Sequence, residues 1–215
     1  MAGIADNLQA VRARLGGASG VTLLAVSKGQ GLERIKEAIA AGQKAFGENY
    51  VQEAVQKMQS LPALEWHLIG PLQSNKTRIA AERFDWVQTI ASEKIARRLS
   101  EQRPAQLPPL NVLIQVNVSG EASKSGIALQ ETEQLARVIA TLPRLRLRGL
   151  MAVPEPGADR SRYQEVKKLY DILKGEFSFD TLSMGMSDDL DVALAEGATL
   201  VRIGTAIFGA RRKAA

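Results

Sequence analysis

Val21-Thr-Leu-Leu-Ala-Val26 is a short apolar stretch with β-branched residues, and it predicts a strand buried on both faces in a parallel sheet. A helix is expected after it, in Leu32-Glu-Arg-Ile-Lys-Glu-Ala-Ile39, because apolar residues recur there with helical spacing. Gly42 stands where a glycine commonly ends a helix. Residues 21–42 therefore predict one strand followed by one helix.

The same pair recurs along the sequence. Further strands are expected at about 44–47, 64–69, 86–90, 110–118, 145–152, 181 and 200–203. Helices are expected at 50–60, 75–83, 92–102, 129–142, 160–176 and 188–196, with an extra helix before the first strand and a short closing segment at the end.

Eight strands that each precede a helix or helical turn predict an α/β fold, a single (β/α)8 TIM barrel with an extra N-terminal helix. No connector is long enough to separate domains, so we expect residues 1–215 to form one domain. The alternative is an open doubly wound sheet. It is disfavoured because no G-x-G-x-x-G follows the first strand and the polar residues lie after many strands rather than at one switch point.

Composition excludes several kinds of site. The chain has no cysteine, and therefore no disulfide, thiolate metal site or cysteine nucleophile, which fits a reducing compartment. We expect no metal site, because the single histidine leaves only carboxylates and carbonyls as ligands and these do not cluster. That histidine, His67, lies in the middle of a strand, where a hydrogen-bonded structural role is expected.

Charge and hydropathy indicate the compartment and the partners. Lysine and arginine number 28 against 23 acidic residues, but they are spread along the chain, with one run at Arg211-Arg212-Lys213, and no aromatic residues interleave with them. We therefore expect no nucleic-acid partner. No apolar run approaches the roughly 18–20 residues of a membrane span, and the start resembles an amphipathic helix rather than a signal peptide. A cytoplasmic protein without a membrane partner is expected.

Polar residues follow several of the predicted strands, at the end of the barrel where catalysis and binding occur in this fold. Lys28 directly follows the first strand, and partial desolvation there would favour the neutral amine that can form a Schiff base. The simpler alternative is a solvated surface lysine. Lys76 and Lys124 lie in predicted loops at the same end, as candidates for a second amine or as solvated residues.

The ends of the last two strands predict an anion site. Ser187 precedes a predicted helix, while Gly204 and Thr205 offer a close backbone approach and a hydroxyl, and phosphate sites in barrels lie at this place. The alternative makes Ser187 an N-cap followed by acidic residues that would weaken an anion site. Arg202 is a charged residue within an apolar strand and requires an acceptor inside the barrel or at its rim.

Five motifs along residues 25–209 carry a family resemblance. They are Ala25-Val-Ser-Lys28, Gly47-Glu-Asn-Tyr-Val-Gln-Glu53, Trp66-His-Leu-Ile-Gly-Pro-Leu-Gln-Ser-Asn-Lys76, Leu182-Ser-Met-Gly-Met-Ser-Asp-Asp189 and Val201-Arg-Ile-Gly-Thr-Ala-Ile-Phe-Gly209. Together they resemble the pyridoxal phosphate homeostasis protein family, which is similar to the barrel domain of alanine racemase.

The resemblance implies a fold-type III protein that binds pyridoxal 5'-phosphate (PLP). It implies that Lys28 holds PLP as a Schiff base. The implied phosphate-holding residues are Ser187, Gly204 and Thr205; Arg202 would face the pyridine nitrogen, and Asn49 would line the site.

The implied function is PLP homeostasis: the protein would hold PLP on Lys28 and buffer it or deliver it, through transient contact with PLP-dependent apo-enzymes, without amino-acid turnover. A monomer is expected. An arginine partner leaves the ring nitrogen unprotonated, which restrains carbanion chemistry. A racemase would also need a tyrosine base from a second domain, for which 215 residues leave no room.

Two alternatives remain at this point. One is a PLP-dependent amino-acid racemase that uses Lys28 as a base. The other is a barrel enzyme for a phosphorylated metabolite such as a sugar phosphate, which explains the anion site but leaves Lys28 and Arg202 without defined roles.

Overall fold

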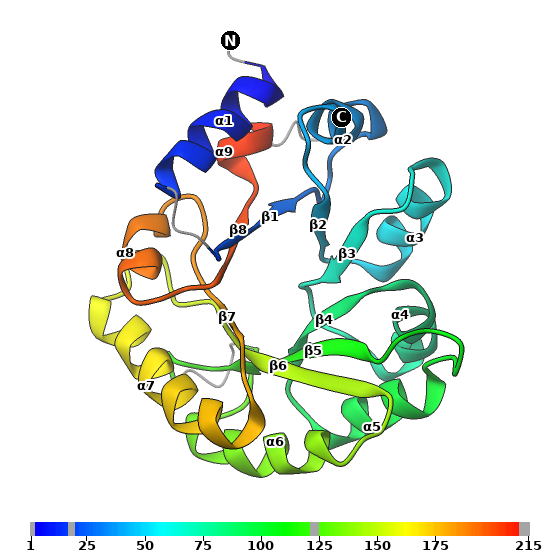
Figure 1. The fold of residues 1–215 in the computed structure, drawn as a ribbon, viewed down its shortest axis with the longest axis vertical. Coiled ribbons are helices and arrows are strands. Elements are labelled where there is room, and N and C mark those ends of the chain that lie inside the picture. The colour runs from blue at the N-terminus through cyan, green and yellow to red at the C-terminus, as the bar shows by residue number, and fades with distance from the viewer. Residues whose placement is uncertain (1–2, 17–19, 121–124, 211–215) are drawn as a thin grey trace.

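The structure is a computed structural model that describes residues 3–16, 20–120 and 125–210. Its centre is a closed barrel of eight parallel strands in sequential order, in which β1 pairs with both β2 and β8 (Figure 1). The strands are β1 Thr22–Val26, β2 Ala45–Glu48, β3 Glu65–Leu68, β4 Trp86–Ile90, β5 Leu110–Val116, β6 Leu145–Ala152, β7 Thr181–Ser183 and β8 Leu200–Ile203. The predicted (β/α)8 barrel is confirmed.

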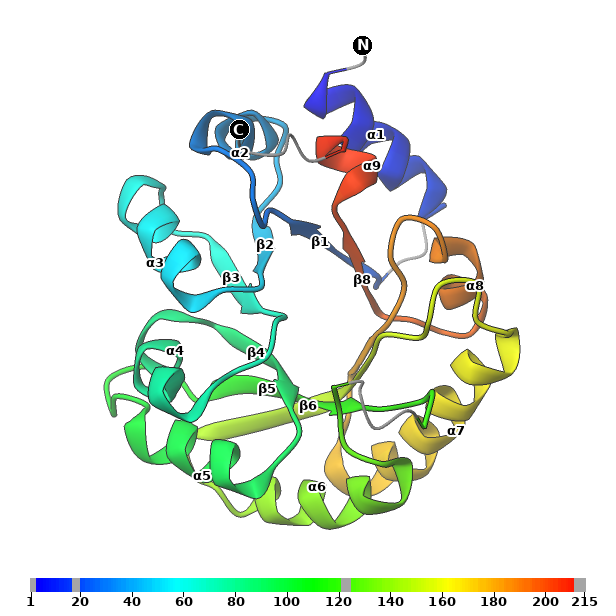
Figure 2. The ribbon, with the colours of Figure 1, turned by 180° about the vertical axis from the view of Figure 1, so that it is seen from behind.

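Helices surround the barrel and cover its outer face, as the view from behind also shows (Figure 2). They are α1 Ile4–Arg14, α2 Leu32–Ala40, α3 Val51–Ser60, α4 Thr77–Arg83, α5 Glu93–Gln102, α6 Thr132–Ala140, α7 Arg160–Phe177, α8 Leu190–Ala195 and α9 Thr205–Phe208, with short 3₁₀ turns at Ser74–Lys76 and Leu129–Glu131. The extra N-terminal helix, α1, lies beside α9, where the Asn7 side-chain amide donates to the Ile207 carbonyl at 2.9 Å.

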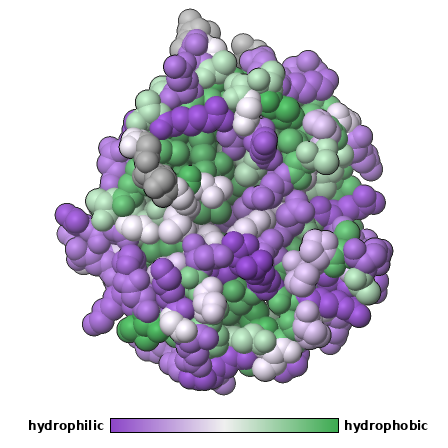
Figure 3. All heavy atoms as spheres, in the orientation of Figure 1, coloured by the Kyte–Doolittle hydropathy of each residue, from purple (hydrophilic) through white to green (hydrophobic). Residues whose placement is uncertain are grey.

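Burial explains why the sequence pattern identified the strands. Side chains inside the barrel and beneath the helices form one large apolar core, which includes Leu8 of α1, Phe46 of β2 and Ile114 of β5. Seen as spheres, the face shown in Figure 1 carries hydrophilic residues around the rim, with apolar atoms showing between them (Figure 3). No helix among the described residues is long and apolar enough to cross a membrane.

Local sequence signals set several helix ends. Gly42 follows α2 with φ +82°, as expected for a glycine that ends a helix. Ser92 accepts a hydrogen bond from the backbone N–H of Ile95 at the start of α5, and Asp159 accepts one from Ser161 at the start of α7. The Ser92 and Asp159 caps set where the chain turns from a strand into the next helix, and Gly42 sets where it leaves α2 toward β2.

Several elements begin or end within a few residues of their predicted boundaries rather than at them, including the fifth strand and α8. The fifth strand stops at Val116 rather than residue 118, and α8 begins at Leu190 rather than residue 188. The second difference bears on the site, because residues 185–189 form a loop instead of a first helical turn. Asp189 occupies the N-cap position without a side-chain cap bond. The N-cap alternative for Ser187 was therefore wrong.

Candidate functional site

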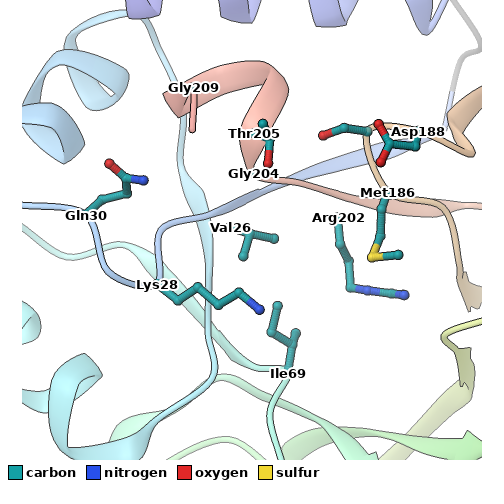
Figure 4. A pocket seen from close by; sticks show the side chains of 11 residues that line it. Val26, Lys28, Gln30, Ile69, Met186, Asp188, Arg202, Gly204, Thr205 and Gly209 are labelled. Atoms are coloured by element: carbon teal, nitrogen blue, oxygen red, sulfur yellow. The ribbon is translucent and has the colours of Figure 1, made fainter. Parts of the chain in front are cut away.

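One pocket, of about 210 Å³, gathers most of the predicted site residues at the ends of β1, β7 and β8 (Figure 4). Its lining residues are Val26, Lys28, Gln30, Ile69, Met186, Ser187, Asp188, Arg202, Gly204, Thr205 and Gly209. The set includes Lys28, Arg202 and the three residues expected to hold an anion. The pocket thus combines two cationic groups, two hydroxyls and an apolar wall.

The pocket has a buried floor and an open rim. Arg202 lies at the floor with only 4% of its surface exposed, whereas Met186, Asp188 and Thr205 are exposed around the mouth. Lys28 enters from the loop after β1, and Val26 and Ile69 lie close to its chain (Figure 4). A small ligand with a flat apolar ring and charged ends suits this arrangement.

Two hydrogen bonds hold the Arg202 guanidinium. Its Nη1 donates to Ser183 Oγ and its Nη2 donates to the Ala152 carbonyl, each at 2.7 Å. Burial lowers the pKa of Arg202 to about 10, while the charge of Asp189 opposes that shift. The group therefore stays protonated at neutral pH and acts only as a hydrogen-bond donor.

The loops after β7 and β8 meet at the side of the pocket expected to bind an anion. Ser187 Oγ accepts a hydrogen bond from the backbone N–H of Ala206 at 3.3 Å, which joins the loop after β7 to α9, the short helix after β8. Asp189 is held by the Tyr163 hydroxyl, which donates at 2.6 Å, and by the Met186 N–H. Asp188 remains exposed on the rim. Asp189, one of the two acidic residues that could weaken an anion site, thus accepts hydrogen bonds from other groups of the protein.

Gly185 gives the β7–α8 loop its shape. It has φ +98°, and a Cβ at this position would lie 2.6 Å from the Ala193 Cβ. Its carbonyl also accepts the Arg202 backbone N–H at 2.9 Å. The residue therefore connects the loop that carries Ser187 to the strand that carries Arg202.

We expect Gly185→Ala to lower the free energy of unfolding by about 1–3 kcal/mol for the collision with Ala193, in addition to about 1–2 kcal/mol for the backbone conformation. Gly157→Ala is the matched control, because Gly157 has φ +75° with nothing within 4 Å of its Cβ position. Urea unfolding of both variants measures the difference. Equal losses would show that the packing against Ala193 is unimportant.

Asn49 lies away from the main pocket. It lines a neighbouring hollow of about 280 Å³ together with Tyr50, Gln73 and Lys76. Its Oδ1 is buried without a hydrogen-bond partner among the described residues. Lys124, the other candidate for a second amine, falls outside the described residues.

A buried charged cluster, which the sequence did not reveal, lies beneath Lys28. The Lys57 ammonium donates to Glu48 Oε1, Glu53 Oε1 and the Ser27 carbonyl, each at 2.7 Å. Glu48 also accepts from the Ser27 hydroxyl at 2.6 Å, and Glu53 accepts from the Gly29 N–H at 2.6 Å. The residues before and after Lys28 are thus both fixed.

Burial raises the pKa of Glu48, and the charge and hydrogen bond of Lys57 oppose that rise. Glu48 is fully buried and Lys57 is 6% exposed, so each depends on the other for its charge. The i, i+4 spacing of Glu53 and Lys57 was the available sequence signal. That signal does not distinguish this buried cluster from an ordinary pair on a solvated helix face.

Comparison with known proteins places the chain in a family. Residues 1–212 match the family model "Alanine racemase, N-terminal domain". The pyridoxal phosphate homeostasis protein of Escherichia coli strain K12 is 54% identical over 226 residues, covering 97% of each chain. The protein of that name from Pseudomonas aeruginosa is 55% identical over 223 residues, covering 98% of this chain and 97% of the relative.

A solved structure agrees with these relatives. PipY of Synechococcus elongatus with PLP bound superposes with a TM-score of 0.87 at 36% identity, covering 96% of this chain and 100% of PipY. Both the sequence and the barrel geometry therefore match over nearly the whole length. The chain belongs to the pyridoxal phosphate homeostasis protein family, within the alanine racemase N-terminal domain family.

Proposed function

We propose that this chain binds PLP in the pocket at the ends of β1, β7 and β8, with Lys28 as the attachment point, and that it serves PLP homeostasis. One observation carries the proposal: Lys28, Arg202 and the joined β7 and β8 loops line one small pocket. PLP presents an aldehyde, a pyridine ring and a phosphate, and the pocket has a matching group for each.

The residues of the pocket fit the cofactor part by part. The Lys28 amine would join the aldehyde carbon with release of one water. Val26, Ile69 and Met186 offer apolar surface to the ring. At the phosphate end, the hydroxyls of Ser187 and Thr205 can donate, and Gly204 leaves the backbone uncovered. When bound, PLP supplies an electron sink for amino-acid chemistry.

The chemistry of Arg202 favours a protein that holds PLP over one that catalyses a reaction with it. Its protonated guanidinium can only donate, so it leaves the ring nitrogen as an acceptor without a proton. Among the described residues that line the pocket there is no tyrosine or histidine to act as a second base opposite Lys28. We infer a non-catalytic protein that holds and releases PLP.

The exposed rim supports release of the cofactor. A cofactor bound here would remain reachable through the mouth formed by Met186, Asp188 and Thr205. We further propose that the protein is a cytoplasmic monomer and that it delivers PLP to PLP-dependent apo-enzymes through this opening. Asn49 and Lys76 line the neighbouring hollow.

Exchange of the α-hydrogen of amino acids tests the non-catalytic role. The protein loaded with PLP is incubated in deuterium oxide with a panel of L- and D-amino acids, and deuterium incorporation is measured by proton NMR. We expect none above the rate of free PLP. A loaded Lys28→Ala sample serves as the control, and steady exchange that disappears in it would establish the racemase alternative instead.

A further inference from the structure

A line of hydrogen-bonded side chains crosses the barrel interior from Arg202. Arg202 on β8 donates to Ser183 on β7, and the Ser183 hydroxyl donates to Gln88 Oε1 on β4 at 2.7 Å. Gln88 Nε2 lies 2.8 Å from His67 Nδ1 on β3, and His67 Nε2 lies 2.7 Å from Glu65 Oε1. Because β4 and β7 are not neighbours in the sheet, the contact between Ser183 and Gln88 spans the inside of the barrel.

The members of this line are sealed from solvent except at the far end. Ser183, Gln88 and His67 are fully buried, and Arg202 is 4% exposed. The Glu65 side chain is 46% exposed and borders a second pocket of about 220 Å³, which His67 also lines. The line therefore joins a buried cation beneath the PLP pocket to a carboxylate at the surface.

The donors and acceptors available in this line fix which partner donates in each hydrogen bond. Arginine can only donate, so Ser183 Oγ accepts from it and uses its own hydrogen for Gln88 Oε1. The amide nitrogen of Gln88 must then donate to His67 Nδ1, which therefore carries no proton. His67 Nε2 carries the proton and donates to the carboxylate of Glu65. The imidazole is thus neutral, with one defined tautomer.

If the hydrogen bonds from Ser183 to Gln88 and from Gln88 to His67 ran in the opposite direction, His67 would need a second proton. A flipped Gln88 amide would place its oxygen toward Nδ1 and its nitrogen toward Ser183 Oγ, which would then accept two donors. A neutral imidazole protonated at Nδ1 would direct its bare Nε2 at Glu65, two acceptors facing each other. Only the doubly protonated imidazole would satisfy both neighbours.

The surroundings of His67 keep it neutral. Burial lowers its pKa, and Glu65 and Asp85 act in the opposite direction. The Trp86 ring stacks on the imidazole with the ring centroids 5.0 Å apart, and the Arg148 guanidinium carbon lies over the Trp86 ring, 4.7 Å from its centroid. The two carboxylates favour a protonated imidazole, but the effect of burial is larger, so the neutral form is favoured.

We propose that His67, Gln88 and Ser183 are positioning residues for Arg202: they fix its guanidinium in one orientation toward the pocket and link that orientation to the tautomer of His67. The identity of the group that Arg202 faces rests on the proposed function. The link between Arg202 and His67 does not, and it can be measured in protein without PLP.

NMR of the imidazole nitrogens tests the link first. The chain has one histidine, so its signals need no assignment. We expect a neutral imidazole with the proton on Nε2 between pH 7 and pH 8, and a clear shift of both nitrogen signals in Ser183→Ala and in Arg202→Met. A proton on Nδ1, or signals that neither substitution moves, would overturn the proposal even if the protein binds no PLP.

Cofactor binding tests the positioning effect. Losing one hydrogen bond to a buried charged group is expected to raise the dissociation constant of PLP about tenfold. We expect this rise in the dissociation constant in Ser183→Ala and in Gln88→Leu, together with a shift of the visible absorption band of bound PLP. The double variant should show no larger effect, because both residues act through the same line of hydrogen bonds.

Thr89→Val is the matched control, because Thr89 is buried on the same strand as Gln88 but donates to the Gly70 carbonyl outside the line. It should lose stability without changing the band. If the wild-type protein binds PLP and neither Ser183→Ala nor Gln88→Leu changes the dissociation constant or the band, the positioning role is wrong while the proposed function stands.

Discussion

Lys28→Ala is expected to abolish covalent attachment of PLP completely, which is the largest effect on binding that we predict. Lys28 is the single lysine among the described residues that line the main pocket. Alanine offers no nitrogen to the aldehyde, so the visible absorption of the bound cofactor should vanish. The phosphate and ring contacts would remain, and any residual binding should be reversible by dialysis.

The controls for this variant separate chemistry from folding. Lys28 is half-buried at the mouth of the barrel, so its replacement should change the free energy of unfolding by no more than about 0.5 kcal/mol. Lys28→Arg keeps a positive charge and should also lose the absorption. Lys76→Ala removes an amine from the neighbouring hollow and should keep it. Retained absorption in Lys28→Ala would place the attachment on another residue.

Lys57→Met is expected to have the largest effect on stability. The substitution keeps most of the volume but leaves Glu48 buried without a cation, and breaking a buried pair in this way costs about 3–5 kcal/mol. It also removes the hydrogen bonds that Lys57 donates to the Ser27 carbonyl and to Glu53. Ser27 precedes Lys28, and Glu53 accepts from the N–H of Gly29, which follows Lys28. Urea unfolding should report the loss of stability, and PLP titration a weaker affinity.

The pH dependence of this variant has a defined sign. A carboxyl whose pKa is raised in the folded state binds its proton more tightly there than in the unfolded chain, so stability falls as pH rises from the unfolded pKa of about 4.5 through the folded pKa. Without Lys57 the pKa of Glu48 should rise further. We therefore expect a greater loss at pH 8 than at pH 5.

Two further variants check the cause of that loss. Adding Glu48→Gln to Lys57→Met removes the uncompensated charge and should recover part of the stability and most of the pH dependence. Lys36→Met breaks an exposed pair with Glu33 and should change stability by less than about 1 kcal/mol. If Lys57→Met is no more costly than Lys36→Met, the buried cluster does not hold this part of the barrel.

The repeat of strands and helices was predictable because burial leaves a direct record in the sequence. The strands β2, β4 and β8 are buried at every residue, as expected for a parallel barrel, whereas in β1 only Leu24 and Ala25 are fully buried. The ends of elements were less predictable. The start of α8 was missed because Ser187 and Asp188 have the composition of a helical first turn, yet tertiary contacts hold Ser187 against Ala206.

The candidate site was predictable in its residues but not in its support. Lys28 and Arg202 are exceptions to the apolar pattern at strand ends, and such exceptions are visible in a sequence. Glu48 and Lys57 meet only because β2 and α3 pack together, and Gln88 reaches Ser183 only across a closed barrel. Contacts of this kind depend on three-dimensional closure. Asn49, chosen from a motif, lies in the neighbouring hollow instead of the main pocket.

The attachment of PLP to Lys28 is the central claim, and peptide mass mapping after borohydride reduction tests it most directly. Reduction fixes the cofactor on the nitrogen that holds it, so proteolysis and mass analysis identify that residue. We predict a single adduct with the mass of reduced PLP, on the peptide that contains Lys28, in the wild-type protein mixed with PLP. An adduct on a different lysine, or none at all, would contradict the account.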